Sequence, residues 1–538
     1  MDRQDKYGVL KQYFGYDAFR DGQESLIDGL LGGSDVFGIM PTGAGKSICY
    51  QLPALMFRGI TLVISPLISL MKDQVAALNQ VGVYAAYLNS SLTQGQYFKA
   101  LDFARKGKYK IIYVAPERLL TDSFLSFAVN ADISCISVDE VHCVSQWGQD
   151  FRPGYLKIVD FIDKLPRRPI VGAFTATATK EVRDDVMRIL KLNNPKIVTT
   201  GFDRKNLSFY VRHAKNKKAE LLRLLREYYG DSGIVYCLTR KLVDEVYGML
   251  SERGIEVSRY HAGMTDEERH RNQEEFTYDR THIMVATNAF GMGIDKPDVR
   301  FVIHYNMPKN MESYYQEAGR AGRDGEKADC YLLYSPQDVH TNQFFIENSR
   351  ENEELSDEEL ENVMEKDRER LKKMVFYCHT KYCYRKYMLN YFGEKADSFC
   401  GGCGNCIRKI EAERYQDKQD RYSGRIHGMA GVRQLVPADG RGKRAFDNPE
   451  LYDQLRLLRN SLAKEMEVPA YVIFTDKTLK EMSMYLPSSR EELLEISGVG
   501  QAKYDKFGKA FMDVISKYTA GHDISQEPVR AKAKIVFR

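Results

Sequence analysis

Short apolar runs alternate with longer amphipathic stretches along the first two hundred residues of the chain. Apolar, β-branched runs separated by helix-length segments are typical of a parallel sheet with helices on both faces. The pattern therefore predicts an α/β lobe, preceded by a mixed, helical stretch over residues 1–34. The runs expected to be its strands are Val36–Met40, Ile60–Ser65, Lys110–Ala115, Ile133–Val138 and Pro169–Phe174.

The same alternation begins again after Gly201. Its clearest strands are Gly233–Cys237, Ile283–Ala286 and Arg300–His304. A second α/β lobe is therefore expected after the first, and the hydrophobic pattern divides the two as residues 1–205 and 206–345.

Beyond the second lobe the pattern changes three times. Residues 346–406 begin with a highly charged, solvated helix over Ser349–Arg370 and end in a cluster of cysteines. Residues 407–446 are rich in Gly, Arg and Asp and have weak periodicity, which predicts a basic linker. Short amphipathic helices over residues 447–520 predict a small all-α bundle, followed by a tail over residues 521–538.

Composition limits the function without defining it. The net charge is +4, from 78 basic and 74 acidic residues, so any contact with nucleic acid has to come from local basic patches. The sequence holds no apolar run of about 18 residues and no signal-peptide core, so we expect no membrane partner. The ten cysteines cluster only near residue 400, which favours metal over disulfides and a cytoplasmic location.

The first candidate site is the loop between Val36–Met40 and a predicted helix over Ser47–Phe57. Its two glycines allow a backbone path that points N–H groups at phosphate oxygens, and its lysine adds a cation for the β- and γ-phosphates. Its serine hydroxyl suits Mg²⁺. Met40 stands where the first Gly of the general motif is expected. The residues predicted to bind nucleotide here are Thr42, Gly43, Gly45, Lys46 and Ser47.

Asp139 and Glu140 follow the strand Ile133–Val138. An acidic pair at a strand end is what a phosphate-loop enzyme needs, because one carboxylate can hold Mg²⁺ through water and the other can orient the attacking water. We assign these roles to Asp139 and Glu140 respectively. The alternative is an ordinary solvated turn.

Arg320 and Arg323 lie three residues apart, which places them on one helical face. An arginine presented across a cleft can stabilise charge on a transferring phosphoryl group. We expect Arg323 to take that role with Arg320 beside it. The alternative is a pair of surface salt bridges.

Four cysteines near residue 400 have the spacing of a metal site. Tight Cys-x-x-Cys turns with one distant cysteine suit tetrahedral Zn²⁺ bound by thiolates. The expected ligands are Cys383, Cys400, Cys403 and Cys406. Cys378 and His379 are the nearest rival ligands.

Taken in order, these motifs resemble the RecQ family of superfamily-two DNA helicases, over roughly residues 10–406 and 448–518. The resemblance implies two tandem RecA-like parallel-sheet lobes, a helical zinc-binding subdomain of structural role and a small all-α HRDC-like bundle. It further implies that Arg20 and Gln23 recognise adenine and that Asp295 contributes to the nucleotide site.

The segment Ser145–Pro153 resembles the family's aromatic-rich loop, which couples single-stranded DNA to ATP hydrolysis. Trp147 is the only Trp and is expected to stack on a base, the alternative being a core residue. Gln149 replaces a usual His in this loop. The segment Phe202–Leu207, which includes Arg204, resembles a family motif of the second lobe, and Lys205 replaces a usual Pro there. The expected nucleic-acid contacts are His142, Trp147, Phe151, Arg152 and Thr287.

The resemblance implies an ATP-dependent 3′-to-5′ DNA helicase that uses ATP, Mg²⁺ and Zn²⁺ in repair and recombination. We expect a monomer at the nucleoid that acts on single-stranded and 3′-tailed duplex DNA, with a single-strand-binding protein as a candidate partner. The rivals are an RNA helicase and a DNA scaffold with an inactive ATPase core. Only residues 407–446 separate the zinc and HRDC-like regions, so the winged helix of many family members is expected to be absent or vestigial.

Overall fold

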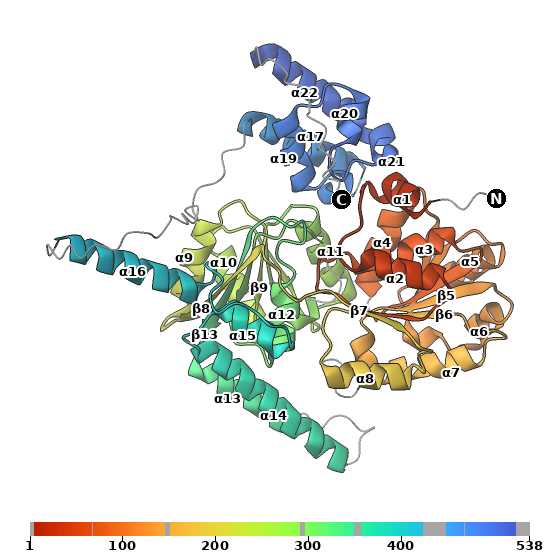
Figure 1. Cartoon of the computed structure of the whole chain (residues 1–538), viewed down its shortest axis with the longest axis horizontal. Coiled ribbons are helices and arrows are strands. Elements are labelled where there is room, and N and C mark those ends of the chain that lie inside the picture. Colours follow the sequence, from red (N-terminus) through yellow and green to blue (C-terminus); the bar gives the residue numbers. More distant parts are fainter. Residues whose placement is uncertain are drawn as a thin grey trace, which may run out of the picture.

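The computed structural model of the chain describes residues 5–66, 68–145, 151–290, 296–348, 357–422, 448–466 and 468–522. Two α/β lobes lie side by side, a helical bundle lies above them, and a long helix projects away from the second lobe (Figure 1). Among the helices of these residues, none combines the length and the apolar character needed to cross a bilayer.

The first lobe is built on a parallel sheet in the order β3-β4-β2-β5-β6-β1-β7. Its strands are β1 (Val36–Ile39), β2 (Ile60–Ile64), β3 (Ala85–Leu88), β4 (Ile111–Val114), β5 (Ile133–Val138), β6 (Ile170–Thr175) and β7 (Lys196–Thr199). Its helices are α1 (Lys6–Val9), α2 (Gln23–Leu31), α3 (Lys46–Met56), α4 (Ile68–Gln80), α5 (Gln94–Arg105), α6 (Asp122–Ala128), α7 (Lys157–Asp163) and α8 (Lys180–Ile189). The predicted α/β lobe is confirmed.

The second lobe repeats this plan with the strand order β10-β11-β9-β12-β13-β8, again all parallel. Its strands are β8 (Leu207–His213), β9 (Gly233–Tyr236), β10 (Val257–Tyr260), β11 (Ile283–Ala286), β12 (Phe301–His304) and β13 (Ala328–Tyr334). Its helices are α9 (Lys217–Glu227), α10 (Arg240–Ser251), α11 (Asp266–Thr277), α12 (Met311–Ala318) and α13 (Pro336–Asn348).

The cysteine-bearing region consists of α14 (Asp357–His379), α15 (Tyr384–Tyr391) and α16 (Gly404–Tyr422). The segment expected to be a linker from residue 407 begins as a helix, since α16 continues to Tyr422 and forms the projecting arm of Figure 1; the linker stays a prediction. The sequence shows no apolar stripe here, and good helix formers such as Glu, Lys, Arg and Gln supply the helical preference instead. Residues 423–447 lie outside the described residues.

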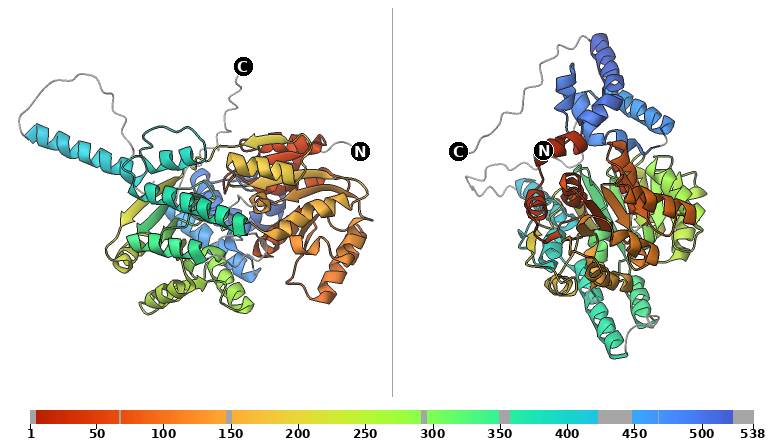
Figure 2. Two further views of the ribbon diagram at one scale, coloured as in Figure 1. Left: turned by 90° about the horizontal axis from the view of Figure 1, so that it is seen from below. Right: turned by 90° about the vertical axis from the view of Figure 1, so that its right-hand side faces the viewer.

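The bundle has an apolar core of its own, separate from the cores of the lobes. Its helices are α17 (Pro449–Glu465), α18 (Ala470–Ile473), α19 (Asp476–Tyr485), α20 (Arg490–Leu494), α21 (Gln501–Lys503) and α22 (Lys509–His522). Figure 1 and the right-hand view of Figure 2 place it against the lobes, and polar contacts with both lobes hold it there. The Lys11 Nζ donates to the carbonyl of Leu494 at 2.9 Å, and Lys480 pairs with Glu326 of the second lobe at 2.9 Å.

The bundle contains a Gly-rich turn at Gly498–Gly500. A Cβ atom built on Gly15 of the first lobe would lie 2.9 Å from the backbone nitrogen of Gly500. The turn therefore packs against the first lobe, and its role in this arrangement is contact between the bundle and the lobe.

Candidate nucleotide and metal sites

The phosphate-binding loop connects β1 to α3, as predicted. Gly43 and Gly45 have φ of +82° and +81°, in the left-handed region that side chains disfavour. Gly45 is also tightly enclosed, since a Cβ there would lie 2.5 Å from the Gln23 Nε2. Both glycines are therefore needed for the path that turns the loop into α3.

Arg20 and Gln23 hold this loop from the side. The Gln23 Nε2 donates to the carbonyls of Ala44 and Gly45 at 3.1 and 3.0 Å, and the Arg20 guanidinium donates to the carbonyl of Gly43. The side chain of Gln23 is buried. The adenine contact expected of this pair stays a prediction, whereas its support of the loop is direct.

The acidic pair lies at the end of β5, opposite the loop. The Glu140 Oε1 is 3.9 Å from the Lys46 Nζ. Glu140 has φ of +46°, a strained conformation for a residue with a side chain. Burial, together with the charge of Glu140, raises the pKa of Asp139 to about 7. Burial alone would also raise the pKa of Glu140. Neighbouring positive charges, of which Lys46 has the largest effect, lower the pKa instead.

His142 lies beside this pair and is 2% exposed. Its Nδ1 is 2.9 Å from the Thr175 Oγ1 and 3.4 Å from the Glu140 Oε2. The Thr175 hydroxyl donates to the carbonyl of Thr177, so the Nδ1 is assigned as the donor to Thr175. The burial of His142 places its ring in the acidic network, and the nucleic-acid contact expected of it stays a prediction.

The arginine-bearing loop of the second lobe follows α12 and faces the phosphate loop. The Thr42 hydroxyl donates to the carbonyl of Gly319 at 3.0 Å. The positive charges of Arg320 and Arg323 are among the causes that lower the pKa of Glu140. The two lobes therefore bring the expected lysine, acidic pair and arginines to one place.

Sequence reasoning placed Arg204 in a family motif but not in the site. Its guanidinium donates to the carbonyls of Thr42, in the phosphate loop, and of Gly319, in the arginine loop. The motif Phe202–Leu207 was the only signal in the sequence, because the residues that Arg204 joins are far apart along the chain.

The residues expected to contact nucleic acid are only partly described. Thr287 lies just after β11 and is buried. The Arg152 Nη1 donates to the carbonyl of Pro66 at 3.3 Å, and the neighbouring Phe151 is half-buried. Trp147 and Asp295 lie outside the described residues, so their roles stay predictions.

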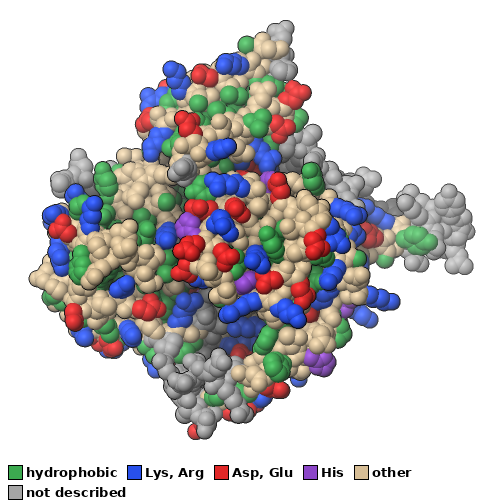
Figure 3. Space-filling model, turned by 180° about the vertical axis from the view of Figure 1, so that it is seen from behind, with side chains coloured by type: hydrophobic (Ala, Val, Ile, Leu, Met, Phe, Trp, Pro, Cys, Tyr) green, Lys and Arg blue, Asp and Glu red, His purple; other side chains and the backbone are tan. Residues whose placement is uncertain are grey.

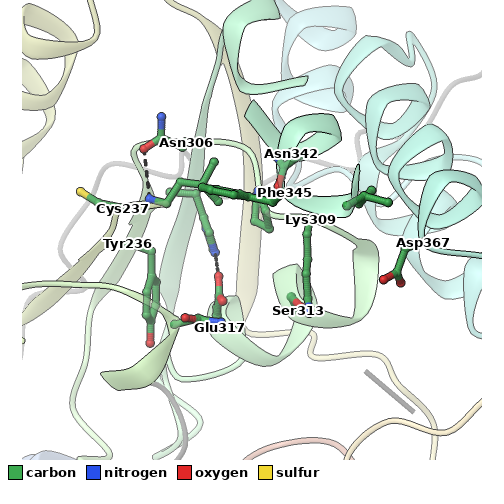
Figure 4. A pocket seen from close by; sticks show the side chains of 14 residues that line it. Tyr236, Cys237, Asn306, Lys309, Ser313, Glu317, Asn342, Phe345 and Asp367 are labelled. Atoms are coloured by element: carbon green, nitrogen blue, oxygen red, sulfur yellow. Dashed lines mark hydrogen bonds and ion pairs between the residues drawn. The ribbon is translucent and has the colours of Figure 1, made fainter. Parts of the chain in front are cut away.

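A cavity of about 300 Å³ lies in the second lobe, at the carboxyl ends of β9 and β12 (Figure 4). Asn306 and Lys309 face it, and Asn288, next to Thr287, forms part of its wall. At its base the His304 Nε2 contacts the Glu317 Oε2 at 2.9 Å. Since Glu317 belongs to α12, the cavity adjoins the helix that leads to Arg320 and Arg323.

The four expected cysteines come together, with their Sγ atoms all within 4.8 Å of one another. The Sγ atoms of Cys383 and Cys403 are 3.8 Å apart, and those of Cys400 and Cys406 are 4.0 Å apart. Thiolates at about 2.3 Å from a tetrahedral Zn²⁺ are separated by about 3.8 Å, so the set fits zinc.

The rival ligands lie elsewhere. Cys378 is not part of the cysteine cluster found among the described residues, and the His379 Nε2 contacts the Tyr334 hydroxyl at 2.9 Å. Two backbone N–H groups point at the cluster instead, from Cys403 to the Cys400 Sγ at 3.3 Å and from Lys386 to the Cys383 Sγ at 3.5 Å. Such bonds orient sulfur ligands toward a metal.

Charge on the surface is mixed. On the face in Figure 3, Lys and Arg side chains are interleaved with Asp and Glu over both lobes and the bundle. On this face, charge alone therefore does not indicate a nucleic-acid path, in agreement with the net charge of +4.

Comparison with known families defines the class of protein first. The model of the DEAD/DEAH box helicase family matches residues 20–185, and that of the helicase conserved C-terminal domain matches residues 216–325. The fold agrees with this class: the solved structure of Mycobacterium smegmatis helicase Lhr bound to ssDNA and AMP-PNP is 20% identical, with a TM-score of 0.50 over 62% of this chain and 48% of that chain. The chain is thus a two-lobed phosphate-loop protein of the helicase class.

The particular family follows from the remaining matches. The RecQ zinc-binding model matches residues 336–407, and the HRDC domain model matches residues 448–515. The ATP-dependent DNA helicase RecQ of Bacillus subtilis (strain 168) is 39% identical over 95% of this chain and 98% of its own length. The protein of the same name from Pasteurella multocida (strain Pm70) is 34% identical over 96% of this chain and 94% of its own. The chain belongs to the RecQ family.

Proposed function

We propose that the protein is an ATP-dependent DNA helicase that moves 3′ to 5′ along a single strand and unwinds duplexes in repair and recombination. The observation that carries the proposal is the meeting of the two lobes at Glu140, which has Lys46 3.9 Å away and has its pKa lowered by the arginines of the other lobe. A site divided between two lobes links nucleotide turnover to their relative movement.

In the proposed reaction, the N–H groups of the phosphate loop and Lys46 hold the β- and γ-phosphates of ATP. Glu140 remains ionised beside these cations, so it can accept a hydrogen bond from the attacking water and orient it. His142, buried against Glu140, fixes the position of that carboxylate. Arg323 neutralises the charge that develops on the transferring phosphoryl group, with Arg320 beside it.

Asp139 and Ser47 would hold Mg²⁺, whose chemistry here is to neutralise the phosphate oxygens. Asp139 is given this task because it directly follows β5 and is buried, while Glu140 is the carboxylate beside Lys46. Asp295 is proposed as a further nucleotide-site residue on the resemblance alone.

We propose that the single strand crosses both lobes, contacting Trp147, Phe151 and Arg152 in the first and Thr287 in the second. The cavity beside Thr287 supports a path over the carboxyl ends of β9 and β12. Single-stranded and 3′-tailed duplex DNA are the proposed substrates, and a single-strand-binding protein is the proposed partner. The protein would act as a monomer on nucleoid DNA in the cytoplasm.

We propose the domain limits 1–205, 206–345, 346–406 and 447–520, and the absence of a winged helix between the last two. The alignment with the Bacillus subtilis relative supports that absence: it spans 589 positions, whereas 95% of the 538 residues is about 511, so the relative has roughly 78 positions without a counterpart here. The described part of the intervening segment is the single helix α16.

Strand displacement tests the proposal directly. A duplex with a 3′ single-stranded tail should be unwound with ATP, while a 5′-tailed and a blunt duplex of the same sequence should be poor substrates at moderate salt. If the 5′-tailed duplex is unwound as fast as the 3′-tailed duplex, the proposed polarity is wrong. If the blunt duplex is unwound as fast, the proposed absence of the winged helix is wrong. An RNA duplex unwound faster than its DNA counterpart would favour an RNA helicase.

A further inference from the structure

The segment that joins the two lobes is held by the zinc-binding region. Arg385, two residues after the zinc ligand Cys383, donates to the Asp203 carboxylate and to the carbonyls of Arg204 and Leu207. The joining segment therefore has a fixed shape on the side that faces α15.

Three further contacts hold Phe202, the residue that precedes Asp203 in this segment. The ring of Phe202 stacks on that of Phe392 with centroids 4.7 Å apart and planes at 17°. The backbone N–H of Phe202 donates to the Glu394 carboxylate, and its carbonyl accepts from the Tyr315 hydroxyl at 2.9 Å. Both the zinc region and α12 thus fix the residues that carry Arg204.

From this fixed segment, the guanidinium of Arg204 reaches between the phosphate loop and the arginine loop. The Nη1 donates to the carbonyl of Thr42 and, at 3.1 Å, to that of Gly319. The Nη2 donates to the carbonyls of Ala321 and Gly322 at 2.9 and 2.7 Å.

The Nε completes the set by donating to the Asn206 Oδ1 at 3.3 Å. A guanidinium has five N–H donors in a rigid fork, so each donor of Arg204 has an acceptor. A lysine offers three donors from one point and could not reach both loops in this way. The arrangement is therefore specific to arginine.

We propose that Arg204 is a positioning residue for ATP hydrolysis, which sets the phosphate loop and the loop of Arg320 and Arg323 at their working separation. The inference rests on the proposed function and deepens it. Arg204 acts through the arginine loop. The carbonyls that it binds belong to Gly319, Ala321 and Gly322, which flank Arg320 in the sequence and lie just before Arg323. Arg385 transmits the position of the zinc region to the same site.

The test is Arg204→Lys in the full chain, with single-stranded DNA present. The turnover number should fall about 10- to 100-fold, as for a misplacement of about 1 Å at a reacting group. The KM for ATP and the Kd for a non-hydrolysable ATP analogue should stay within about threefold, because all five N–H donors of Arg204 have acceptors in the protein. Arg212→Lys, at an exposed position in β8, is the matched control and should behave as wild type.

A double variant separates positioning from an independent role. Because Arg204 acts through the arginine loop, adding Arg204→Lys to Arg323→Ala should cost little beyond Arg323→Ala alone. If the turnover number of the double variant falls by the product of the two single losses, the proposal is overturned. An unchanged turnover number in Arg204→Lys would overturn it as well. A raised KM and analogue Kd with normal turnover would make Arg204 a nucleotide ligand and would overturn it too.

Arg385→Lys keeps the test decisive if Arg204→Lys fails to fold. Arg385→Lys should lower the turnover number at least about fivefold, because the bonds that it alters hold the segment that carries Arg204. One zinc per chain should be retained. Normal turnover with zinc retained would contradict the proposal. If single-stranded DNA does not stimulate the ATPase of the wild-type protein, the proposed function is wrong. That result is seen in the wild type alone, so it is distinct from a failure of the proposal for Arg204.

Discussion

Glu140 combines a strained backbone with a cationic environment. Its φ is +46°, its carboxylate is 3.9 Å from the Lys46 Nζ, and Lys46 and the arginines of the second lobe lower its pKa against the effect of burial. Strain of this kind persists only where the surroundings enforce it. The carboxylate is therefore kept ionised at the point where the two lobes meet.

Replacing this carboxylate should separate binding from turnover. Glu140→Gln removes the acceptor that orients water, so ATP turnover should fall roughly 10³-fold or more while ATP is still bound. Glu267→Gln, at an exposed position in α11, is the control and should have no effect. Turnover near wild type in Glu140→Gln, measured by phosphate release, would remove Glu140 from the mechanism.

Asp139 predicts a pH dependence of stability. Its pKa is about 7 in the folded protein, above the ordinary value of 3.8, so the folded state binds the proton more tightly than the unfolded state. The stability that this provides is fully present below about pH 4 and is lost as the pH rises to 7. Above pH 7 the folded state is destabilised, because the buried carboxylate of Asp139 is ionised.

Asp139→Asn should remove that destabilisation. In the absence of Mg²⁺ and nucleotide its Tm should exceed that of the wild type at pH 8 by about 3–6 °C, as expected for 1–2 kcal/mol in domains of this size. The difference should shrink as the pH is lowered to 5. A Tm difference that is the same at both values, measured by scanning calorimetry, would show that Asp139 does not titrate between pH 5 and 8 in the folded protein and would contradict the raised pKa.

At the scale of elements, the interior strands other than β13 were predicted, and the edge strands β3, β7, β8 and β10 were not. β2, β5 and β11 are buried on both faces and read as continuous apolar runs, whereas the edge strand β7 is largely exposed and carries no such pattern. The helix α16 was missed for the same reason, since it has no apolar face. Hydrophobic periodicity records burial, so elements with little burial leave little signal.

The candidate site divides in the same way. The phosphate loop, the acidic pair and the cysteine turns were predicted because their members are close in the sequence. Arg204 was not, because its partners Thr42 and Gly319 become neighbours only through folding. The burial of His142 likewise depends on Thr175, which a neighbouring strand supplies.

The cysteine set predicts one zinc per chain that is needed for stability. Cys403→Ser removes a thiolate ligand, and because metal binding is coupled to folding, both the zinc content and the Tm should fall. Cys378→Ala is the matched control, since Cys378 is also buried but lies outside the set, and it should retain one zinc. Elemental analysis that finds zinc unchanged in Cys403→Ser would contradict the assignment.

At the scale of the whole molecule, the bundle touches both lobes, through Lys11 in the first and Glu326 in the second. Relative movement of the lobes must therefore alter at least one of these contacts. The Lys480–Glu326 pair is partly exposed, so its contribution is modest and falls with salt.

Charge reversal tests this docking. Lys480→Glu should speed amide hydrogen exchange in residues 10–15 about two- to fivefold, the effect of about 0.5–1 kcal/mol, and adding Glu326→Lys should restore protection. Lys464→Glu, at an exposed position in α17, is the control. Exchange that is unaffected by the single reversal would mean that the bundle is held by its other contacts.

The central claim is that single-stranded DNA controls an ATPase shared between two lobes. The most direct measurement is the ATP turnover of the full chain without polymer, with single-stranded DNA, with blunt duplex DNA and with single-stranded RNA. We expect ATP turnover to be stimulated strongly by single-stranded DNA, weakly by blunt duplex DNA and little by RNA. Turnover that is equal with and without single-stranded DNA, or stimulated by RNA alone, would contradict it.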